Sequence, residues 1–415
     1  MNDSSRDTRR RTSAITSRII ATIASSVRTR RVVALSHIGF LFVGIANTLL
    51  GPVLPLLSER WKLNDTQGGY LFTAQFTGAI AGSALSGPLM KKLGVMPVLA
   101  AGYGGLAVAT ATLAFSPWLA GVIAIATLGF SLGLTNPATN LLISELNSER
   151  RAAALNLLNL VWGVGAIACP PLISTLAKGG NASRPLGALA SALAIVSLAL
   201  ALSHLPSLPV KSDESTMRSE STLRARLNSF VLLTGVLIFM YVGTEAAIGG
   251  WIAAYAQRLG ATAQSYWALT PSLFYAGLLT GRAAASVFLR RISEMRLIFF
   301  SLIGAVGGIL VIILGQGLLT ISIGAGLAGF GLAAVFPTTF AIFTQRCGAE
   351  ATRIAGMLFV LASLGGAVIP WLVGWASDFY GNLRIGLIVP LLGSLLMIAL
   401  QGAIILDFSF ARRKV

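Results

Sequence analysis

Glu245 is the residue with the clearest chemical potential, because it lies within an apolar run that extends from Phe239 to Tyr255. An ionised side chain at the centre of a bilayer costs about 2.5 to 3.5 kcal/mol, so an acid in such a run is expected to have a function. A carboxylate there could bind a coupling ion, H⁺ or alternatively Na⁺, on one side of a membrane and release it on the other. The structural alternative is an acid that is kept protonated or paired.

A second group of side chains, in other apolar segments, could bind a neutral solute. Amides offer a donor and an acceptor without charge, which suits a polyhydroxyl compound, and aromatic rings offer apolar faces for a sugar ring. For any one amide the alternative is a hydrogen bond between helices, worth only about 0.6 kcal/mol. The predicted substrate contacts are Asn47, Gln75, Asn136, Asn140, Asn159, Trp162, Trp251, Tyr275 and Thr338.

Arg282 is another charge within an apolar segment. It lies roughly 10 Å from the basic end of its segment, whereas Glu245 lies roughly 26 Å into its own, at 1.5 Å per residue. We therefore expect no direct pair between them and place Arg282 in a cytoplasmic gate, with snorkelling to the membrane surface as the alternative. The other predicted gate residues are Lys91, Lys92, Glu145, Arg290 and Arg291.

The composition places these residues in a membrane protein. Of the 415 residues, 55% are hydrophobic and 11% are charged, and the mean hydropathy is +0.79. The net charge of +17 sits in short loops and tails, so nucleic-acid binding is not expected. Cys169 and Cys347 have no metal-ligand spacing, and neither a phosphate-binding glycine loop nor a catalytic triad is present. We predict no cofactor, no metal and no enzymatic activity.

Twelve apolar segments, each near the roughly 20 residues that span a bilayer, must position the polar residues. We expect them at 33–57, 68–90, 95–115, 118–143, 152–177, 184–205, 227–257, 266–289, 295–314, 318–343, 352–376 and 383–406. The predicted division is a basic tail (1–31), a six-helix bundle (32–205), a linker (206–226), a second six-helix bundle (227–406) and a basic tail (407–415).

The distribution of Lys and Arg predicts the orientation in the membrane. Alternate loops carry 24 of these residues on the side of the N-terminus and six on the other side. The positive-inside rule then places both termini and the linker in the cytoplasm. The short loops and the Ala-, Gly- and Arg-rich composition are typical of a bacterial chain, so we expect the protein in the inner membrane. We also expect it to be a monomer.

The two halves of the sequence also repeat. Gly129, Pro137 and Gly165 recur at an offset of 200 as Gly329, Pro337 and Gly365, and Lys91-Lys92 recurs at an offset of 199 as Arg290-Arg291. Duplicated six-helix halves are typical of transporters whose binding site lies between the halves at the middle of the bilayer. The fold class predicted is therefore all-α, with two pseudo-symmetric bundles.

These features resemble the major facilitator superfamily. The stretch 87–94, Gly-Pro-Leu-Met-Lys-Lys-Leu-Gly, is similar to that family's loop between helices two and three, with Lys91 where an Asp is expected. Within the superfamily the chain is most similar to the fucose/galactose/glucose proton-symporter branch. The stretches that carry this likeness are 44–52, 63–68, 89–93, 135–137, 156–159 and 241–251.

The resemblance also marks where this chain departs from the branch. Fucose-type members carry acids at the positions of Gly51 and Leu132, so Glu245 is the only acid left well inside the membrane. Their helix-five sugar ligands correspond to Asn159 and Trp162, which implies a related but altered pocket. The resemblance implies a secondary transporter of a monosaccharide, with a hexose coupled to H⁺ as the leading hypothesis. An uncoupled uniporter, an exporter of amphipathic compounds or lipids, and a non-transporting sensor are the alternatives.

Overall fold

The computed structural model describes residues 29–177, 180–203, 229–260 and 266–413, without the side chains of 266, 349, 352–353 and 406–413. Most of the expected N-terminal tail and the whole expected linker therefore lie outside the described residues. All regular structure within the described ranges is helical. The first half comprises a helix at Thr29–Thr48, then α2 (Leu50–Trp61), α3 (Asp65–Leu93), α4 (Val95–Phe115), α5 (Trp118–Leu146), α6 (Arg151–Leu176) and α7 (Ser183–Ala201). The second half comprises α9 (Ser229–Arg258), α10 (Leu269–Phe288), α11 (Glu294–Leu314), α12 (Leu318–Leu332), α13 (Val335–Cys347), α14 (Ala351–Tyr380), α15 (Leu383–Gly386) and α16 (Ile388–Arg413).

The helices form an integral membrane bundle. Ten helices within the described residues are long and apolar enough to cross a membrane, and each predicted apolar segment falls on a helix or on a pair of consecutive helices. α3 and α10 are long enough but too polar to count among the ten. These two helices carry Gln75 and Arg282, and polar residues inside a span are expected where a helix borders a cavity.

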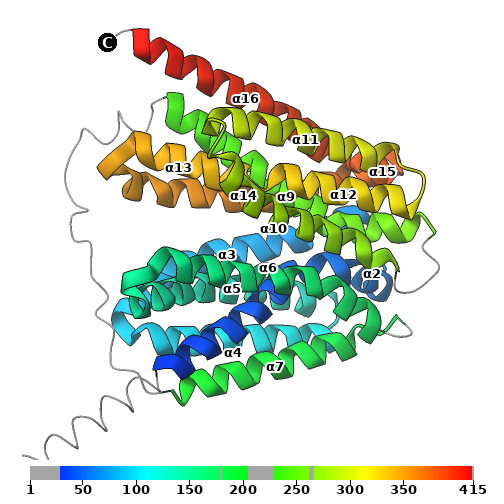
Figure 1. The fold of residues 1–415 in the computed structure, drawn as a ribbon. Helices are drawn as coiled ribbons and strands as arrows, with labels where there is room; N and C mark the ends of the chain where they lie inside the picture. The colour runs from blue at the N-terminus through cyan, green and yellow to red at the C-terminus, as the bar shows by residue number, and fades with distance from the viewer. Residues whose placement is uncertain (1–28, 178–179, 204–228, 261–265, 414–415) are drawn as a thin grey trace, which may run out of the picture.

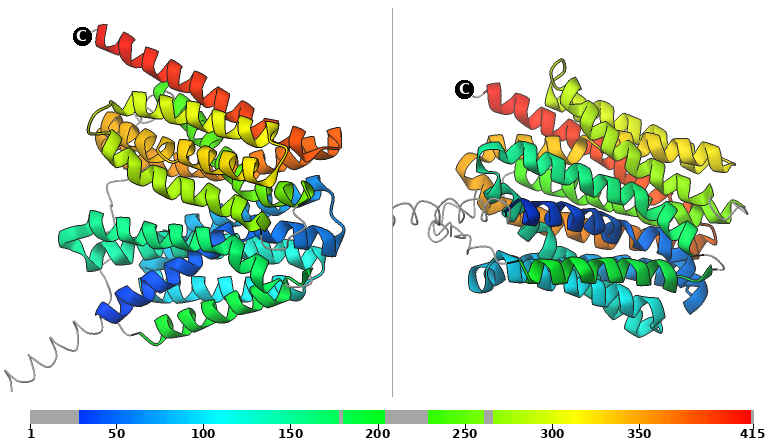
Figure 2. Two further views of the ribbon diagram at one scale, coloured as in Figure 1. Left: turned by 45° about the vertical axis from the view of Figure 1, so that its right-hand side comes forward. Right: turned by 60° about the horizontal axis from the view of Figure 1, so that its bottom comes forward.

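The helices are grouped in two bundles that lie side by side. Figure 1 shows the helices up to α7 in one bundle and α9 to α16 in the other, and the left view of Figure 2 keeps the two apart. We call them the N-terminal and C-terminal bundles. α3 packs against α14, α10 against α6 and α2 against α9, so these three helix pairs join the bundles.

The sequence repeat appears as the same helix contact in both bundles. A Cβ at Gly129 would lie 1.8 Å from the carbonyl oxygen of Gln75, and a Cβ at Gly329 would lie 2.1 Å from that of Phe274. Only glycine permits this approach of α5 to α3, and of α12 to α10 in the other bundle. The duplication therefore preserves the packing that builds each bundle.

One end of the molecule is closed by polar contacts between the bundles, and we call it the latch end. The guanidinium of Arg258 donates to both carboxylate oxygens of Asp65, at 2.8 and 2.5 Å. Ser377 donates to the same carboxylate. Asp378 accepts hydrogen bonds from the backbone N–H groups of Asp65 and Thr66, so it caps α3 from the other bundle.

Further from the latch end, toward the middle of the molecule, other hydrogen bonds link the two bundles. Thr73 in α3 donates to the carbonyl of Ala367 in α14 at 2.9 Å, and Ser272 in α10 donates to that of Ile167 in α6 at 3.0 Å. The indole N–H of Trp251 donates to the carbonyl of Pro370 at 2.8 Å. The interface between the two bundles, which we call the seam, is therefore closely packed from the latch end inward.

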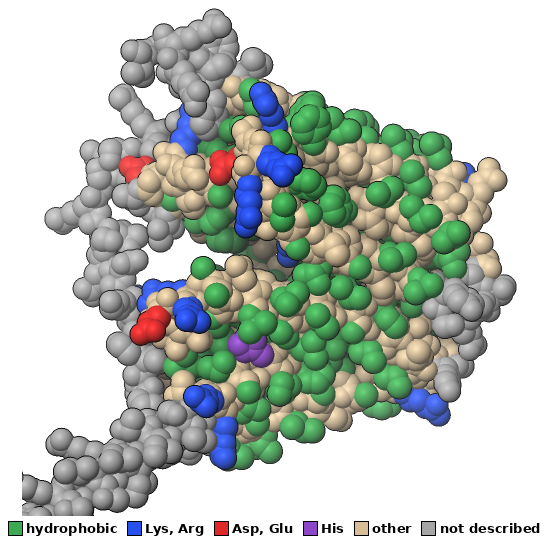
Figure 3. All heavy atoms as spheres, in the orientation of Figure 1, with side chains coloured by type: hydrophobic (Ala, Val, Ile, Leu, Met, Phe, Trp, Pro, Cys, Tyr) green, Lys and Arg blue, Asp and Glu red, His purple; other side chains and the backbone are tan. Residues whose placement is uncertain are grey.

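The opposite end is open, and we call it the basic end because Lys91, Lys92, Arg290 and Arg291 lie there. Figure 3 shows the surface hollowed between the two bundles at this end, at the left of the view, with Lys and Arg side chains around it. The molecule thus stands in a state closed at the latch end and open at the basic end.

Candidate substrate and ion-binding site

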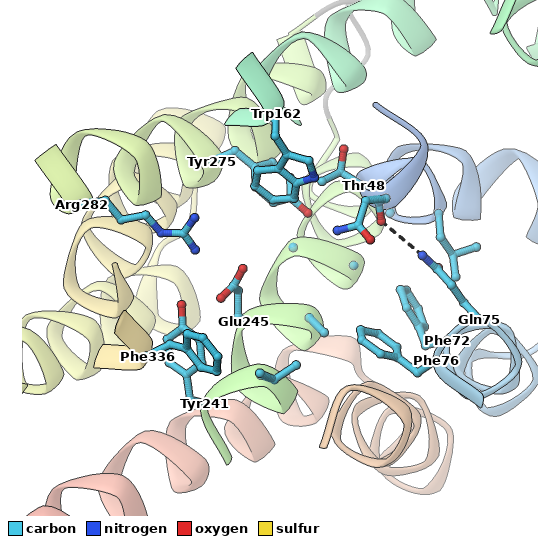
Figure 4. A pocket seen from close by; sticks show the side chains of 17 residues that line it. Thr48, Phe72, Gln75, Phe76, Trp162, Tyr241, Glu245, Tyr275, Arg282 and Phe336 are labelled. Carbon is cyan, nitrogen blue, oxygen red and sulfur yellow. Dashed lines mark hydrogen bonds between the residues drawn. The ribbon is translucent and has the colours of Figure 1, made fainter. Parts of the chain in front are cut away.

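A cavity of about 260 Å³ lies between the bundles, at the inner limit of the packed seam. It is lined by the first helix, α2, α3 and α6 on one side and by α9, α10 and α13 on the other (Figure 4). The residues that line it are Asn47, Thr48, Leu50, Gly51, Phe72, Gln75, Phe76, Trp162, Tyr241, Val242, Glu245, Ala246, Gly249, Gly250, Tyr275, Arg282 and Phe336. Its volume lies near the lower limit for small-molecule pockets, roughly 300 to 1,000 Å³.

The C-terminal bundle supplies the charged side of the cavity. Tyr241, Glu245 and Gly249 recur every four residues on α9, so they form one face of that helix. Tyr275 and Arg282 are seven residues apart on α10 and also share a face. In Figure 4 the carboxylate of Glu245 points into the cavity between Arg282 and Tyr241.

Glu245 and Arg282 line the same cavity, which corrects the expectation that they lie at different depths in the membrane. The expectation that they form no direct pair is not contradicted, because the ion pairs found among the described residues do not join them. They are close enough to interact electrostatically, and both also interact with Tyr241. Depth counted along each helix separately ignores where each helix starts and how far an arginine side chain reaches. The opposite charges partly compensate each other within the membrane, where a lone charge is costly.

Two polar atoms on this side have no protein partner of ordinary hydrogen-bond length. These are the hydroxyl of Tyr241 and the Nε of Arg282, both buried. A buried donor without a partner costs about 1 to 3 kcal/mol, so such atoms are expected to bind water or a ligand. They point to a polar solute beside Glu245.

The N-terminal bundle supplies a neutral side. Phe72, Gln75 and Phe76 share a face of α3, and the side-chain amide of Gln75 donates to the backbone carbonyl of Asn47 at 3.2 Å. The side chain of Asn47 is exposed to the cavity. Trp162 completes this side from α6, where its backbone contacts Gly44 closely. This side can donate and accept hydrogen bonds and can stack on a ring without adding charge.

Of the predicted substrate contacts, Asn47, Gln75, Trp162 and Tyr275 line the cavity together with Glu245. Trp251 does not, because it is buried in the seam and hydrogen-bonded to Pro370. It is six residues from Glu245, which places it about 240° around the helix. In the state described here, Trp251 therefore packs the two bundles together.

The remaining predicted contacts also lie off the cavity lining. Asn140 donates to the carbonyl of Asn136, and Asn159 donates to that of Leu155, so both amides are engaged with their own helices. Thr338 is buried in α13, two residues beyond the cavity residue Phe336. Their roles as substrate contacts stay predictions for another state of the molecule.

The predicted gate residues are divided between two places. Arg282 lies in the cavity, while Glu145 pairs with Arg151 at 3.3 Å, so this exposed ion pair lies within the N-terminal bundle. The paired basic residues 91–92 and 290–291 lie at matching exposed positions of the two bundles, at or just beyond the ends of α3 and α10. Their gating role stays a prediction.

Sequence reasoning missed Tyr241, Phe72 and Phe76. Each stands one helical turn or less from a residue that was recognised, since Tyr241 is four residues before Glu245 and the two phenylalanines flank Gln75. A search of the residues about one helical turn before and after each recognised polar residue would have found all three. The latch had no comparable signal, because Asp65 and Arg258 are 193 residues apart.

Comparisons with known proteins agree with this architecture. A family model described as Major Facilitator Superfamily matches residues 37–370. The sodium-dependent glucose transporter 1 of Xenopus laevis is 24% identical over 369 residues, 81% of this chain and 74% of that protein. The glucose/galactose transporter of Brucella abortus is 22% identical over 378 residues, 86% of this chain and 91% of that one. The solved structure of a nucleoside transporter, NupG, aligns with a TM-score of 0.76 at 14% identity, over 90% of this chain and 98% of that chain, and shows the shared fold.

Proposed function

Because this chain belongs to the Major Facilitator Superfamily, we propose that it is a secondary transporter of a monosaccharide, a hexose, coupled to H⁺ through Glu245. The observation that carries the proposal is the composition of the cavity. One bundle contributes an acid with a nearby cation, and the other contributes amides and rings. The names of the Xenopus and Brucella relatives support a sugar as the substrate.

The proposed cycle uses the two bundles as rocking halves. In the state open at the latch end, Glu245 takes up a proton and the sugar binds against Asn47, Gln75 and Trp162. The protonated acid carries no charge, so the loaded site can close and reopen at the basic end. There the proton leaves, and the carboxylate is stabilised by Arg282. Coupling requires only that the two open states differ in affinity for the proton and the sugar.

The same proposal predicts the orientation of the protein in the membrane. The basic end, where the exposed pairs 91–92 and 290–291 lie, would face the cytoplasm, as the positive-inside rule requires. The structure then represents the state that releases substrate into the cell. The chain would act as a monomer in a bacterial inner membrane, without a cofactor.

The decisive experiment is uptake of labelled glucose by proteoliposomes that contain the purified protein. An inward H⁺ gradient and an inward Na⁺ gradient are imposed separately, because the name of the Xenopus relative includes sodium dependence. Galactose, fucose, mannose and a nucleoside serve as competitors, since aromatic residues could also stack on a base. We expect accumulation driven by H⁺ and competition by hexoses.

Other outcomes would select the alternatives. Equilibration without accumulation under either gradient would indicate a uniporter and a structural Glu245. Flux of a nucleoside or of an amphipathic dye without flux of any sugar would contradict a sugar transporter. Binding of sugar without counterflow would indicate a sensor.

A further inference from the structure

A second hollow lies on the membrane-facing surface of the C-terminal bundle, away from the central cavity. It has a volume of about 570 Å³ and is bordered by α10, α11 and α12. Phe288, Phe300, Leu327 and Phe330 line it and are themselves between 42% and 60% exposed, so the groove opens outward. Ser301 is the only hydroxyl-bearing residue in its lining. Such a surface fits a hydrocarbon chain.

Small residues create this groove. Gly304, Gly307, Gly331 and Ala334 line it, and a Cβ at Gly307 would meet nothing within 4 Å. At the repeat offset of 200, Ala334 corresponds to Leu134 of the N-terminal bundle, which is buried and lies against Gly102. The side chain at this groove-lining position is thus smaller in the C-terminal bundle than in the N-terminal one.

The rim of the groove at the basic end is positively charged. Phe288, Ile292 and Leu297 line the groove, and the connection between them carries Arg290, Arg291 and Arg296, all exposed. Glu294 is the one acid in this stretch, so the rim has a net positive charge. Basic residues beside an apolar crevice at a membrane surface bind anionic lipid headgroups.

The length of the groove also suits a lipid. It follows α11 from Leu297 to Val311, which is about 21 Å at 1.5 Å per residue. The hydrocarbon core of a bilayer is roughly 30 Å thick, so one leaflet contributes about 15 Å. An acyl chain of one leaflet can therefore lie along the groove while its headgroup stays at the basic end.

We propose that this groove is a binding site for an anionic glycerophospholipid, with one acyl chain along α11 and the headgroup phosphate at Arg290 and Arg291. The proposal does not depend on the transported substrate, because the groove and the central cavity have different linings. A bound lipid would tie α10 to α11 on the side of α10 that faces away from the substrate.

The test is native mass spectrometry of the detergent-purified protein after addition of phosphatidylglycerol or phosphatidylcholine with identical acyl chains. We expect one retained phosphatidylglycerol per chain and much weaker retention of phosphatidylcholine. Arg290→Gln with Arg291→Gln should lower the preference for phosphatidylglycerol by about 30-fold, since each charge near an anionic surface contributes about 1 kcal/mol. The matched control is Lys91→Gln with Lys92→Gln, which removes the same charge from the equivalent loop and should leave the bound lipid in place.

A second variant separates the groove from general attraction to the basic surface. Gly307→Leu adds an apolar side chain to the groove at a position where a Cβ meets nothing within 4 Å, and it should abolish retention of the lipid while leaving all charges unchanged. Ala111→Leu, at an exposed position of α4, is its control. Equal retention by wild type and Gly307→Leu, or an equal loss in the two double variants, would overturn the proposal, because the lipid would then be held by surface charge alone.

Discussion

The two bundles share a scaffold but differ where they face the cavity. The glycine contacts of α5 with α3 recur between α12 and α10, whereas the cavity-facing residues differ. Gly165 approaches the carbonyl of Leu41 as Gly365 approaches that of Phe239, so the offset between the first helix and α9 is 198 and Glu245 corresponds to Asn47. Arg282 corresponds to Ser83 at the offset of 199. Positions that pack a bundle have stayed alike, and positions that face the solute have diverged. We infer a division of labour, with ion coupling in the C-terminal bundle and neutral solute binding in the N-terminal one.

Among the substitutions considered, the largest effect is a loss of stability at the glycine contacts that the two bundles share. Gly129→Ala and Gly329→Ala each place a Cβ about 2 Å from a backbone carbonyl that cannot move freely. Overpacking typically costs about 1 to 3 kcal/mol, and a contact with rigid backbone lies at the upper end of that range. Thermal unfolding in detergent should show a similar, large loss of stability for both. Gly307→Ala, with open space at its Cβ, should leave the melting temperature unchanged. A large loss in only one bundle would contradict a shared scaffold.

The next effect concerns the charged side of the cavity. Arg282→Gln leaves the carboxylate of Glu245 without the cation that shares its cavity, and an uncompensated charge inside a membrane costs about 2.5 to 3.5 kcal/mol. We expect the initial rate of gradient-driven uptake to fall by about 100-fold. Arg282→Lys should recover part of the rate because it restores the charge. Normal uptake by Arg282→Gln would place Arg282 outside the coupling machinery.

A smaller effect is expected on the neutral side. Asn47→Ala removes an amide that is exposed to the cavity, and losing a hydrogen bond costs about 1 kcal/mol. The KM for the sugar should rise by about five- to tenfold, with the accumulation ratio at saturating sugar unchanged. Loss of accumulation by this variant would show that the N-terminal bundle also takes part in coupling.

The smallest effect concerns the latch. Asp65→Asn weakens the pair with Arg258, which is about half-exposed, and such pairs contribute about 0.5 to 1 kcal/mol. The state open at the latch end should become about two- to fivefold more populated. Labelling of Ala246→Cys in an otherwise cysteine-free chain, with a membrane-impermeant maleimide added at the latch end, measures this. Glu145→Gln, which removes an exposed pair within one bundle, should not change the labelling rate.

Much of the fold could be predicted from the sequence because membrane-spanning helices can be recognised by their length and hydropathy. The repeat of Gly129 at Gly329, visible in the sequence, falls on the same close helix contact in both bundles. The site was harder, because composition shows which polar residues are in the membrane but not which way each helix is turned. Gln75 and Trp251 were both predicted from the sequence as substrate contacts. In the structure Gln75 faces the cavity, whereas Trp251 faces the seam between the bundles. Contacts between distant segments, such as the latch, left no local pattern.

The role of Glu245 can be measured by following sugar counterflow and H⁺-driven accumulation in parallel, for wild type, Glu245→Gln and Trp162→Ala. Glutamine keeps the shape of Glu245 but cannot release a proton. The account predicts that Glu245→Gln retains counterflow and loses accumulation, whereas Trp162→Ala weakens both at low sugar and still accumulates at saturation. Accumulation by Glu245→Gln at the wild-type level would contradict the central claim that this acid carries the coupling ion.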